Sequence, residues 1–130
     1  MMGPLFLTVE EVILLNQSQI EAHGGIHGVR DRGSLESALG APQNHLAYMG
    51  GDVFDLAGAL MAALTRNHPF LDGNKRTGLL AAAVFLELNG VEVPDSVDWL
   101  KQVEALATGI ACGTQDKEEA AALFRRYCGT

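Results

Sequence analysis

The chain has 130 residues, of which 48% are hydrophobic and 19% are charged, so the composition predicts one folded domain over residues 1–130 and excludes a disordered chain. The net charge of −7 argues against direct nucleic-acid binding, since nucleic-acid-binding domains usually carry a basic surface. The longest apolar run, Leu79–Leu86, is too short to cross a bilayer, and the N-terminus shows no signal-peptide pattern. We therefore expect a cytoplasmic protein without a membrane segment.

The first predicted element is a helix near the N-terminus. Thr8 and Glu11 have the spacing of a capping box, and apolar residues follow at helical intervals from about Val9 to Ala22. Glycines end this helix and recur through the loop of residues 24–33. His23 and His27 flank two of those glycines, so we interpret the polar side chains of the loop as groups that bond to neighbouring backbone rather than as a metal site.

The remaining apolar patterns predict further helices with short connections. The most apolar one is Gly73–Leu88, whose middle is apolar on every face, as is typical of a helix surrounded by others. The sequence therefore predicts an all-α fold, a compact bundle of about six helices around a buried central helix. The other predicted helices begin at Ser34, with Pro42 starting a second half or kinking it; after the N-cap Asp52, ending at Leu64 or Asn67; at Pro94–Asp95, ending near Ala111; and at Gln115 or Asp116, ending near Cys128.

Charged and polar side chains crowd into His68–Arg76, between the apolar segments Val53–Leu64 and Leu79–Leu88. Charged groups between two core-forming helices are costly unless they face a cleft, so this stretch predicts an active-site loop that leads into a helix. Lys75 and Arg76 fall in the first helical turn, where cations oppose the dipole but the free N–H groups favour anions. This conflict with stability predicts a phosphate-binding site.

Two side chains of this loop have the chemistry for phosphoryl transfer. Asp72 beside a polyphosphate is a natural Mg²⁺ ligand, although N-capping the next helix would also explain an Asp there. His68 could remove a proton from an incoming hydroxyl, although a lone loop histidine is more often structural. We expect Pro69 to keep His68 out of the helical conformation, and Phe70 to anchor the loop in the core.

This stretch resembles the signature of the Fic/Doc superfamily, HxFx[D/E]-[G/A]-N-[G/K]-R. The chain matches it at every fixed position, with His68, Phe70, Asp72, Gly73, Asn74, Lys75 and Arg76. In the wider Fic group, which transfers AMP from ATP to protein hydroxyls, a glycine follows the Asn and a second Arg lies three residues after the first. The residues at those places are Lys75 and Leu79 here, as in the shorter Doc branch.

The resemblance to the Doc branch implies a toxin of a type II toxin–antitoxin system. It implies a protein kinase that transfers the γ-phosphate of ATP to a hydroxyl of a translation factor, elongation factor Tu, and so blocks translation. It also implies a cognate antitoxin whose disordered C-terminal segment folds onto the toxin. The catalytic roles that it implies fall on His68 as the base, Asp72 as the Mg²⁺ ligand and Lys75. The phosphate-binding residues that it implies are Arg66, Gly73, Asn74, Lys75 and Arg76.

Two other functions stay open on the sequence alone. An adenylyltransferase of the ordinary Fic kind would use the same motif but would have to tolerate Lys75. A catalytically inert fold that acts only by binding a partner would not need His68, Asp72 and Asn74 together. The enzymatic interpretations make one structural prediction. The segments Asp52–Leu64 and Gly73–Leu88 should pack as neighbours, with the side chains of His68 and Lys75 opening on one cleft.

Overall fold

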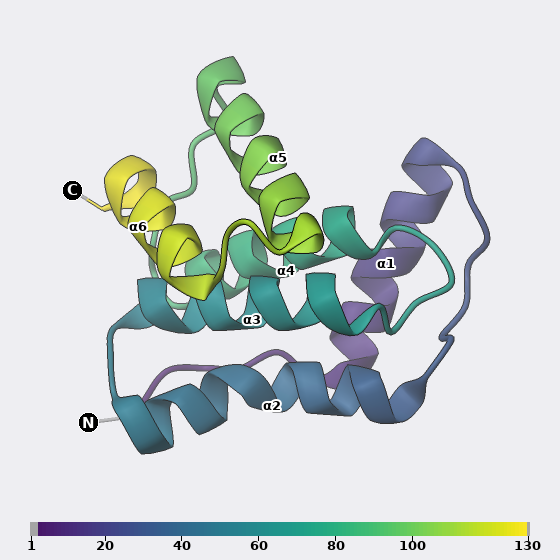
Figure 1. The fold of residues 1–130 in the computed structure, drawn as a ribbon, viewed down its shortest axis with the longest axis horizontal. Helices are drawn as coiled ribbons and strands as arrows, with labels where there is room; N and C mark the ends of the chain where they lie inside the picture. The colour runs from purple at the N-terminus through teal and green to yellow at the C-terminus, as the bar shows by residue number, and fades with distance from the viewer. Residues whose placement is uncertain (1–2, 130) are drawn as a thin grey trace.

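The structure, a computed structural model, describes residues 3–129, and this part of the chain is all-helical (Figure 1). The predicted all-α fold of about six helices is therefore confirmed. Within the described residues the only β-type pairing is an isolated bridge between Val29 and Phe70. The helices are α1 (Val9–His23), α2 (Arg32–Met49), α3 (Val53–Asn67), α4 (Asn74–Leu88), α5 (Val97–Cys112) and α6 (Lys117–Cys128).

Three helices begin with the reciprocal hydrogen bonds of a capping box. At α1 the Glu11 amide donates to the Thr8 hydroxyl (3.2 Å), and the Thr8 amide donates to the Glu11 carboxylate (2.8 Å). Asp52 and Asp55 make the same arrangement at the start of α3. At α6 the N-cap is Asp116, one of the two predicted starting points. Each box satisfies amides that no helical carbonyl can reach, which is why these starts are readable from local sequence.

Away from the motif loop, two helix starts differ from the sequence-based expectation. α2 begins earlier than Ser34, because Asp31 is the N-cap and its carboxylate accepts the Ser34 amide (3.1 Å). The helix then continues through Pro42, whose buried ring packs into the interior. α5 begins later than Pro94–Asp95, because the Ser96 hydroxyl accepts the Trp99 amide (3.2 Å) and so caps the helix there.

The most enclosed helix is α3, not α4. It packs against α2, α4, α5 and α6, whereas α4 contacts α1, α3 and α5 (Figure 1). Small residues allow this close packing: a Cβ at Gly58 would lie 2.6 Å from the carbonyl oxygen of Lys117 and 3.0 Å from the amide nitrogen of Ala121, both in α6. The apolar run of α4 is therefore only partly surrounded, and four of its residues stay half-buried: Leu79, Leu80, Ala83 and Val84.

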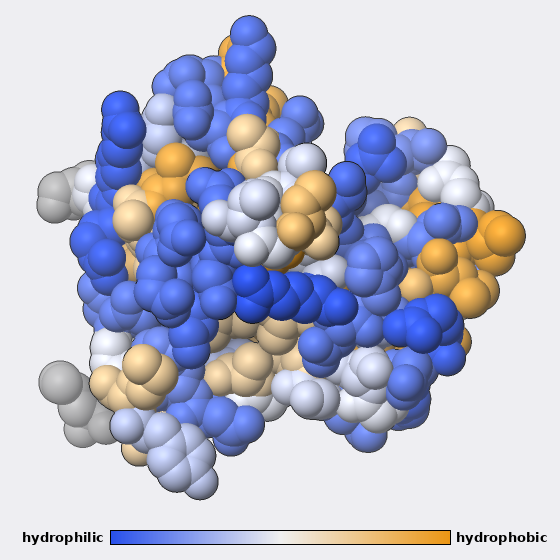
Figure 2. Space-filling view, in the orientation of Figure 1, coloured by the Kyte–Doolittle hydropathy of each residue, from blue (hydrophilic) through white to orange (hydrophobic). Residues whose placement is uncertain are grey.

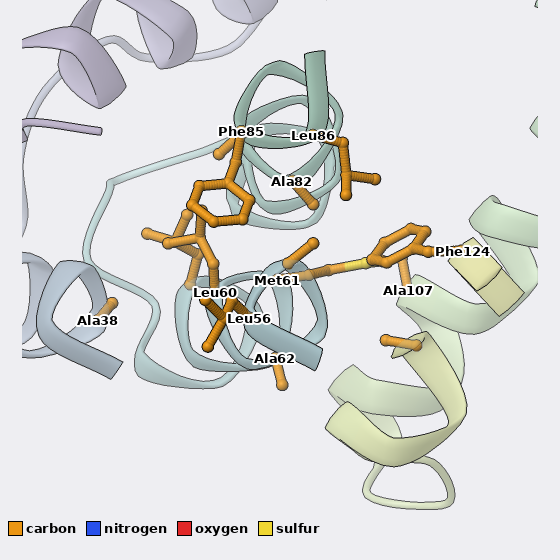
Figure 3. Packing of buried hydrophobic residues seen from close by; sticks show 14 of the residues in the cluster. Ala38, Leu56, Leu60, Met61, Ala62, Ala82, Phe85, Leu86, Ala107 and Phe124 are labelled. Carbon is orange, nitrogen blue, oxygen red and sulfur yellow. The ribbon is translucent and has the colours of Figure 1, made fainter. Parts of the chain in front are cut away.

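The core fills the space between α3 and its neighbours (Figure 3). Phe85 of α4 lies over Leu60 of α3, and Met61 points from α3 toward Phe124 of α6. All four side chains are at most 1% exposed. The neighbouring α3 and α4 that the sequence predicts are therefore confirmed, and they fix where the loop between them opens. Among residues 3–129, no helix has the length and apolar character that crossing a bilayer requires.

Candidate active site

The motif loop begins where α3 ends, and its first residue has an unusual backbone. His68 has φ 48° and ψ 53°, and among the described residues it is the only one other than glycine with positive φ. A left-handed conformation costs a non-glycine residue about 1–2 kcal/mol. Pro69 helps to end α3 here, because a proline disfavours the right-handed helical region for the residue before it, but it does not by itself favour a positive φ. His68 thus leaves the helix as expected, and its side chain is exposed.

Phe70 and Asn74 hold the loop in shape from within. Phe70 is 1% exposed, so the predicted anchor is confirmed. The Asn74 side chain accepts the Phe70 amide at Oδ1 (3.0 Å) and donates from Nδ2 to the Phe70 carbonyl (3.0 Å). Nδ2 also lies 3.3 Å from Nδ1 of His68. Because these bonds occupy the Asn74 amide, its side chain orients the loop and the imidazole instead of reaching outward to a phosphate.

The start of α4 lacks the side-chain cap that the sequence predicts. Gly73 is the N-cap, with φ 77°, and no side-chain hydrogen bond caps the helix. Asp72 is not the cap, because its Oδ2 instead accepts the Ile26 amide (2.8 Å) from the loop between α1 and α2. The first amides of α4 therefore have no side-chain acceptor. Lys75 and Arg76 beside them are exposed, and neither forms an ion pair among the described residues. Free amides beside two cations are suited to an anion.

The motif loop opens on a cleft of about 570 Å³. One wall carries the motif residues, and both His68 and Lys75 line it, as expected from the sequence. The opposite wall is α5, which contributes Glu104, Ala107 and Thr108. Figure 2 shows the surface hollowed between α5 and the end of the molecule where the α1–α2 and α3–α4 loops lie. The predicted site residues on the cleft are His68, Asp72, Gly73, Asn74, Lys75 and Arg76.

Arg66 is the one predicted site residue that the structure places elsewhere. It does not line the cleft. Its Nη1 lies 2.9 Å from Oδ1 of Asp116, and its Nη2 donates to the Gln115 carbonyl (3.0 Å). The pKa of the Asp116 carboxyl is lowered, first by the Lys117 amide and then by Arg66, against the opposing effect of burial. Arg66 therefore binds the N-terminal end of α6 and is not part of the cleft.

Carboxylates near the cleft are few. Among residues 3–129, no group of three or more His, Cys, Asp or Glu side chains is placed to hold a metal ion. Asp72 and Glu104 are the carboxylates that line the cleft. Of the hydrogen bonds described, Asp72 uses only Oδ2, so Oδ1 can take another partner. One available carboxylate oxygen fits Mg²⁺ bound together with a polyphosphate, since that ion usually keeps phosphate and water ligands.

A buried amide from α1 supports the loop from behind. Asn16 is fully buried, and its Nδ2 donates to the Asp72 carbonyl (2.9 Å) and to the Thr77 hydroxyl (3.0 Å). Periodicity alone did not mark this residue as part of the site, because Asn16 lies on a helix far away in sequence. Two bonds that span the motif from Asp72 to Thr77 fix the start of α4 relative to α1.

Replacing Asn16 by Ala should loosen this support. We expect the free energy of unfolding to fall by about 1–2 kcal/mol, because one buried and one partly buried acceptor lose their donor and a small void remains. Urea denaturation of the wild type and the variant would measure the loss. The matched control is Asn44→Ala, an exposed Asn on α2, which should change stability by less than about 0.5 kcal/mol. Equal stability of Asn16→Ala and the wild type would contradict the supporting role.

A sequence model described as the Fic/DOC family matches residues 6–86, which contain all the predicted site residues. The chain belongs to the Fic/Doc family. It is 35% identical over 125 residues to "Protein kinase doc" of Escherichia phage P1, in an alignment that covers 95% of this chain and 96% of that protein. It is 39% identical over 105 residues to "Toxin Doc" of Mycolicibacterium smegmatis, covering 78% of each. The expected resemblance to the Doc branch is thereby confirmed.

Proposed function

We propose that this chain is a Doc-type toxin that acts as a protein kinase, transferring the γ-phosphate of ATP to a hydroxyl of a translation factor, with elongation factor Tu as the target. The observation that carries the proposal is the start of α4, where uncapped amides and the exposed Lys75 and Arg76 share one cleft with His68 and Asp72. The relative named as a protein kinase supports the reaction class, and the relative named as a toxin supports the biological role.

The phosphate-binding part of the site is the first turn of α4. Its amides and the two cations stabilise negative charge on the phosphates, and this stabilisation grows as charge develops during transfer. Gly73 lets the backbone take the positive φ at which the helix begins. In this proposal Lys75 contacts the terminal phosphate, and Arg76 holds the neighbouring phosphate.

The base in this proposal is His68. Its exposed imidazole lies on the same cleft as the cations, where a target hydroxyl can approach the γ-phosphate. The imidazole takes the proton of the hydroxyl, the hydroxyl oxygen bonds to the γ-phosphorus, and ADP departs with the electrons of the broken P–O bond. Asp72 would hold Mg²⁺, which supplies charge neutralisation on the phosphates when it is bound.

Transfer of the γ-phosphate is favoured over transfer of AMP by the residue that follows this turn. Leu79 lines the cleft, at the position where the adenylyltransferases of the wider Fic group carry a second Arg. An apolar side chain there offers no charge for a second phosphate-binding subsite, so the cations gather at a single place. The chemical group transferred can therefore be tested directly with two labels.

The test uses purified protein, elongation factor Tu and ATP labelled either at the α or at the γ phosphorus. We expect γ label on the target protein and no α label. Lys75→Ala should abolish the labelling, because the terminal phosphate loses its cation. Lys101→Ala, which removes an exposed Lys from α5, should leave the labelling unchanged. Label from the α position would instead assign the chain to the adenylyltransferases.

The proposal includes a partner and a compartment. A cognate antitoxin, with a disordered C-terminal segment that folds onto this chain, would hold the activity in check, and both target and toxin would meet in the cytoplasm. Co-expression of the adjacent gene should restore growth to cells that express this chain and should yield a complex of the two proteins. Continued growth arrest with no complex would contradict this part of the proposal.

A further inference from the structure

The loop between α1 and α2 runs alongside the motif loop. The Leu71 amide donates to the Gly28 carbonyl (3.0 Å), and the isolated bridge pairs Val29 with Phe70. The amides of Arg30 and Asp31 both donate to the Pro69 carbonyl, at 2.8 and 3.1 Å. Figure 1 shows the two loops at the same end of the molecule. The α1–α2 loop is thus a backbone support for the segment that carries His68.

Arg30 adds a side-chain contact to this support. Its Nε donates to the His68 carbonyl (2.7 Å), and its Nη2 donates to the Asn67 carbonyl (3.1 Å). Both carbonyls lie at the C-terminal end of α3, where no further helical amide can reach them. A guanidinium offers several donors in a rigid fork, so a single side chain can bond both oxygens. A cation there also suits the negative end of the helix dipole.

Together these bonds fix the backbone on both sides of the imidazole. Residues 30 and 31 hold the carbonyls of Asn67, His68 and Pro69, three residues in succession. The middle one is His68, whose left-handed conformation makes it the residue most in need of external support. Asn74 contacts the imidazole itself, and Arg30 contacts the backbone that directs it.

We propose that Arg30 is a positioning residue, which holds the main chain of His68 in the left-handed conformation that presents its imidazole to the phosphate-binding turn. Arg30 contacts the backbone of the motif loop from outside the cleft, since it does not line the cleft. The contribution of Arg30 is therefore to the orientation of the base and not to ATP binding. The kinetic test of this inference rests on the proposed kinase function, whereas the test by the His68 resonances does not.

The kinetic test compares Arg30→Ala with a matched control, Arg32→Ala. Arg32 is a neighbouring exposed arginine that pairs with Glu10 and Glu36 and has no bond to the motif loop. We expect Arg30→Ala to lower kcat about 10- to 100-fold, because a small misplacement of a catalytic group is costly, while the KM for ATP changes less than about twofold. Arg32→Ala should match the wild type in both. A wild-type kcat in Arg30→Ala would overturn the proposal.

A second measurement separates this inference from the kinase proposal. The imidazole resonances of His68 can be assigned by their loss in His68→Ala and then compared between the wild type and Arg30→Ala. We expect the His68 resonances to shift and broaden in Arg30→Ala, while those of His23 and His45 stay in place. This result would support the positioning role even if the labelling assay showed no kinase activity. Unchanged His68 resonances would overturn the positioning role whatever the activity.

Arg30→Lys covers the case in which the alanine variant does not fold. The lysine keeps the charge and a long stem, but its ammonium has no planar fork to bond both carbonyls in the same geometry. We expect a kcat between those of the wild type and Arg30→Ala, with a smaller shift of the His68 resonances. A lysine variant with wild-type kcat and wild-type His68 resonances would overturn the proposal by itself.

Discussion

Replacing His68 by Ala should abolish phosphoryl transfer and growth inhibition. We expect the rate of transfer to the target to fall about 10²- to 10⁴-fold, because the variant has no group at this position to take the hydroxyl proton. ATP binding should be largely retained, since the proposed mechanism places the phosphates against the first turn of α4 and not against the imidazole. Single-turnover labelling measures the rate, and colony formation after induction measures the toxicity.

The control for this variant is His23→Ala, which removes an exposed histidine at the end of α1. It should be as toxic and as active as the wild type. Because Asn74 contacts the His68 ring, the thermal unfolding of His68→Ala must also be shown to resemble that of the wild type. Toxicity that persists in a folded His68→Ala would remove the need for chemistry and would favour a protein that acts only by binding its partner.

Gly58→Ala should be the most damaging small change in the core. The added Cβ would lie 2.6 Å from a carbonyl oxygen and 3.0 Å from an amide nitrogen of α6, both backbone atoms that cannot rotate away. α3 and α6 would have to separate, so we expect the free energy of unfolding to fall by about 2–3 kcal/mol despite the better helix propensity of alanine. Urea denaturation measures the change.

Gly40→Ala is the matched control because it places the same methyl group inside a helix without a clash. At Gly40, in α2, the nearest atom to a new Cβ is the Asn44 side-chain nitrogen at 3.9 Å. We expect this variant to be more stable than the wild type by about 0.5–1 kcal/mol. A Gly58→Ala protein as stable as Gly40→Ala would show that the α3–α6 contact is looser than the structure indicates.

Most of the fold follows from signals that are local in sequence. Thr8 with Glu11 marks the start of α1, and Asp52 marks that of α3, because a cap acts within one helical turn. The prediction that α4 is the central helix was wrong, because enclosure depends on contacts that are not local in sequence. Leu79–Leu86 in α4 is the longest apolar run of the chain, but the enclosure of a helix depends on how closely its neighbours can approach. Small residues around Gly58 allow that close approach at α3.

In the candidate site, too, local features could be predicted from the sequence and long-range contacts could not. The residues of the motif are contiguous, so the sequence alone could place His68 and Lys75 on one cleft. The sequence did not indicate the roles of Asn16 and Arg30, because their contacts with the motif depend on how distant segments of the chain meet in the fold. The expected roles of three other residues changed because they found different partners. The Asn74 amide is bonded within the motif loop. Asp72 accepts an amide from the α1–α2 loop instead of capping α4, and Arg66 faces α6.

The helix that forms the wall of the cleft opposite the motif carries a natural fluorophore. Trp99, the only tryptophan in the chain, lies on α5, the helix that also supplies Glu104 and Thr108 to the cleft. Its indole is 3% exposed, with its ring centroid 5.9 Å from that of Phe124 and 5.5 Å from that of Tyr127, both on α6. A change in the packing of α5 against α6 should therefore change the fluorescence emission of Trp99, so this packing can be followed without an added label.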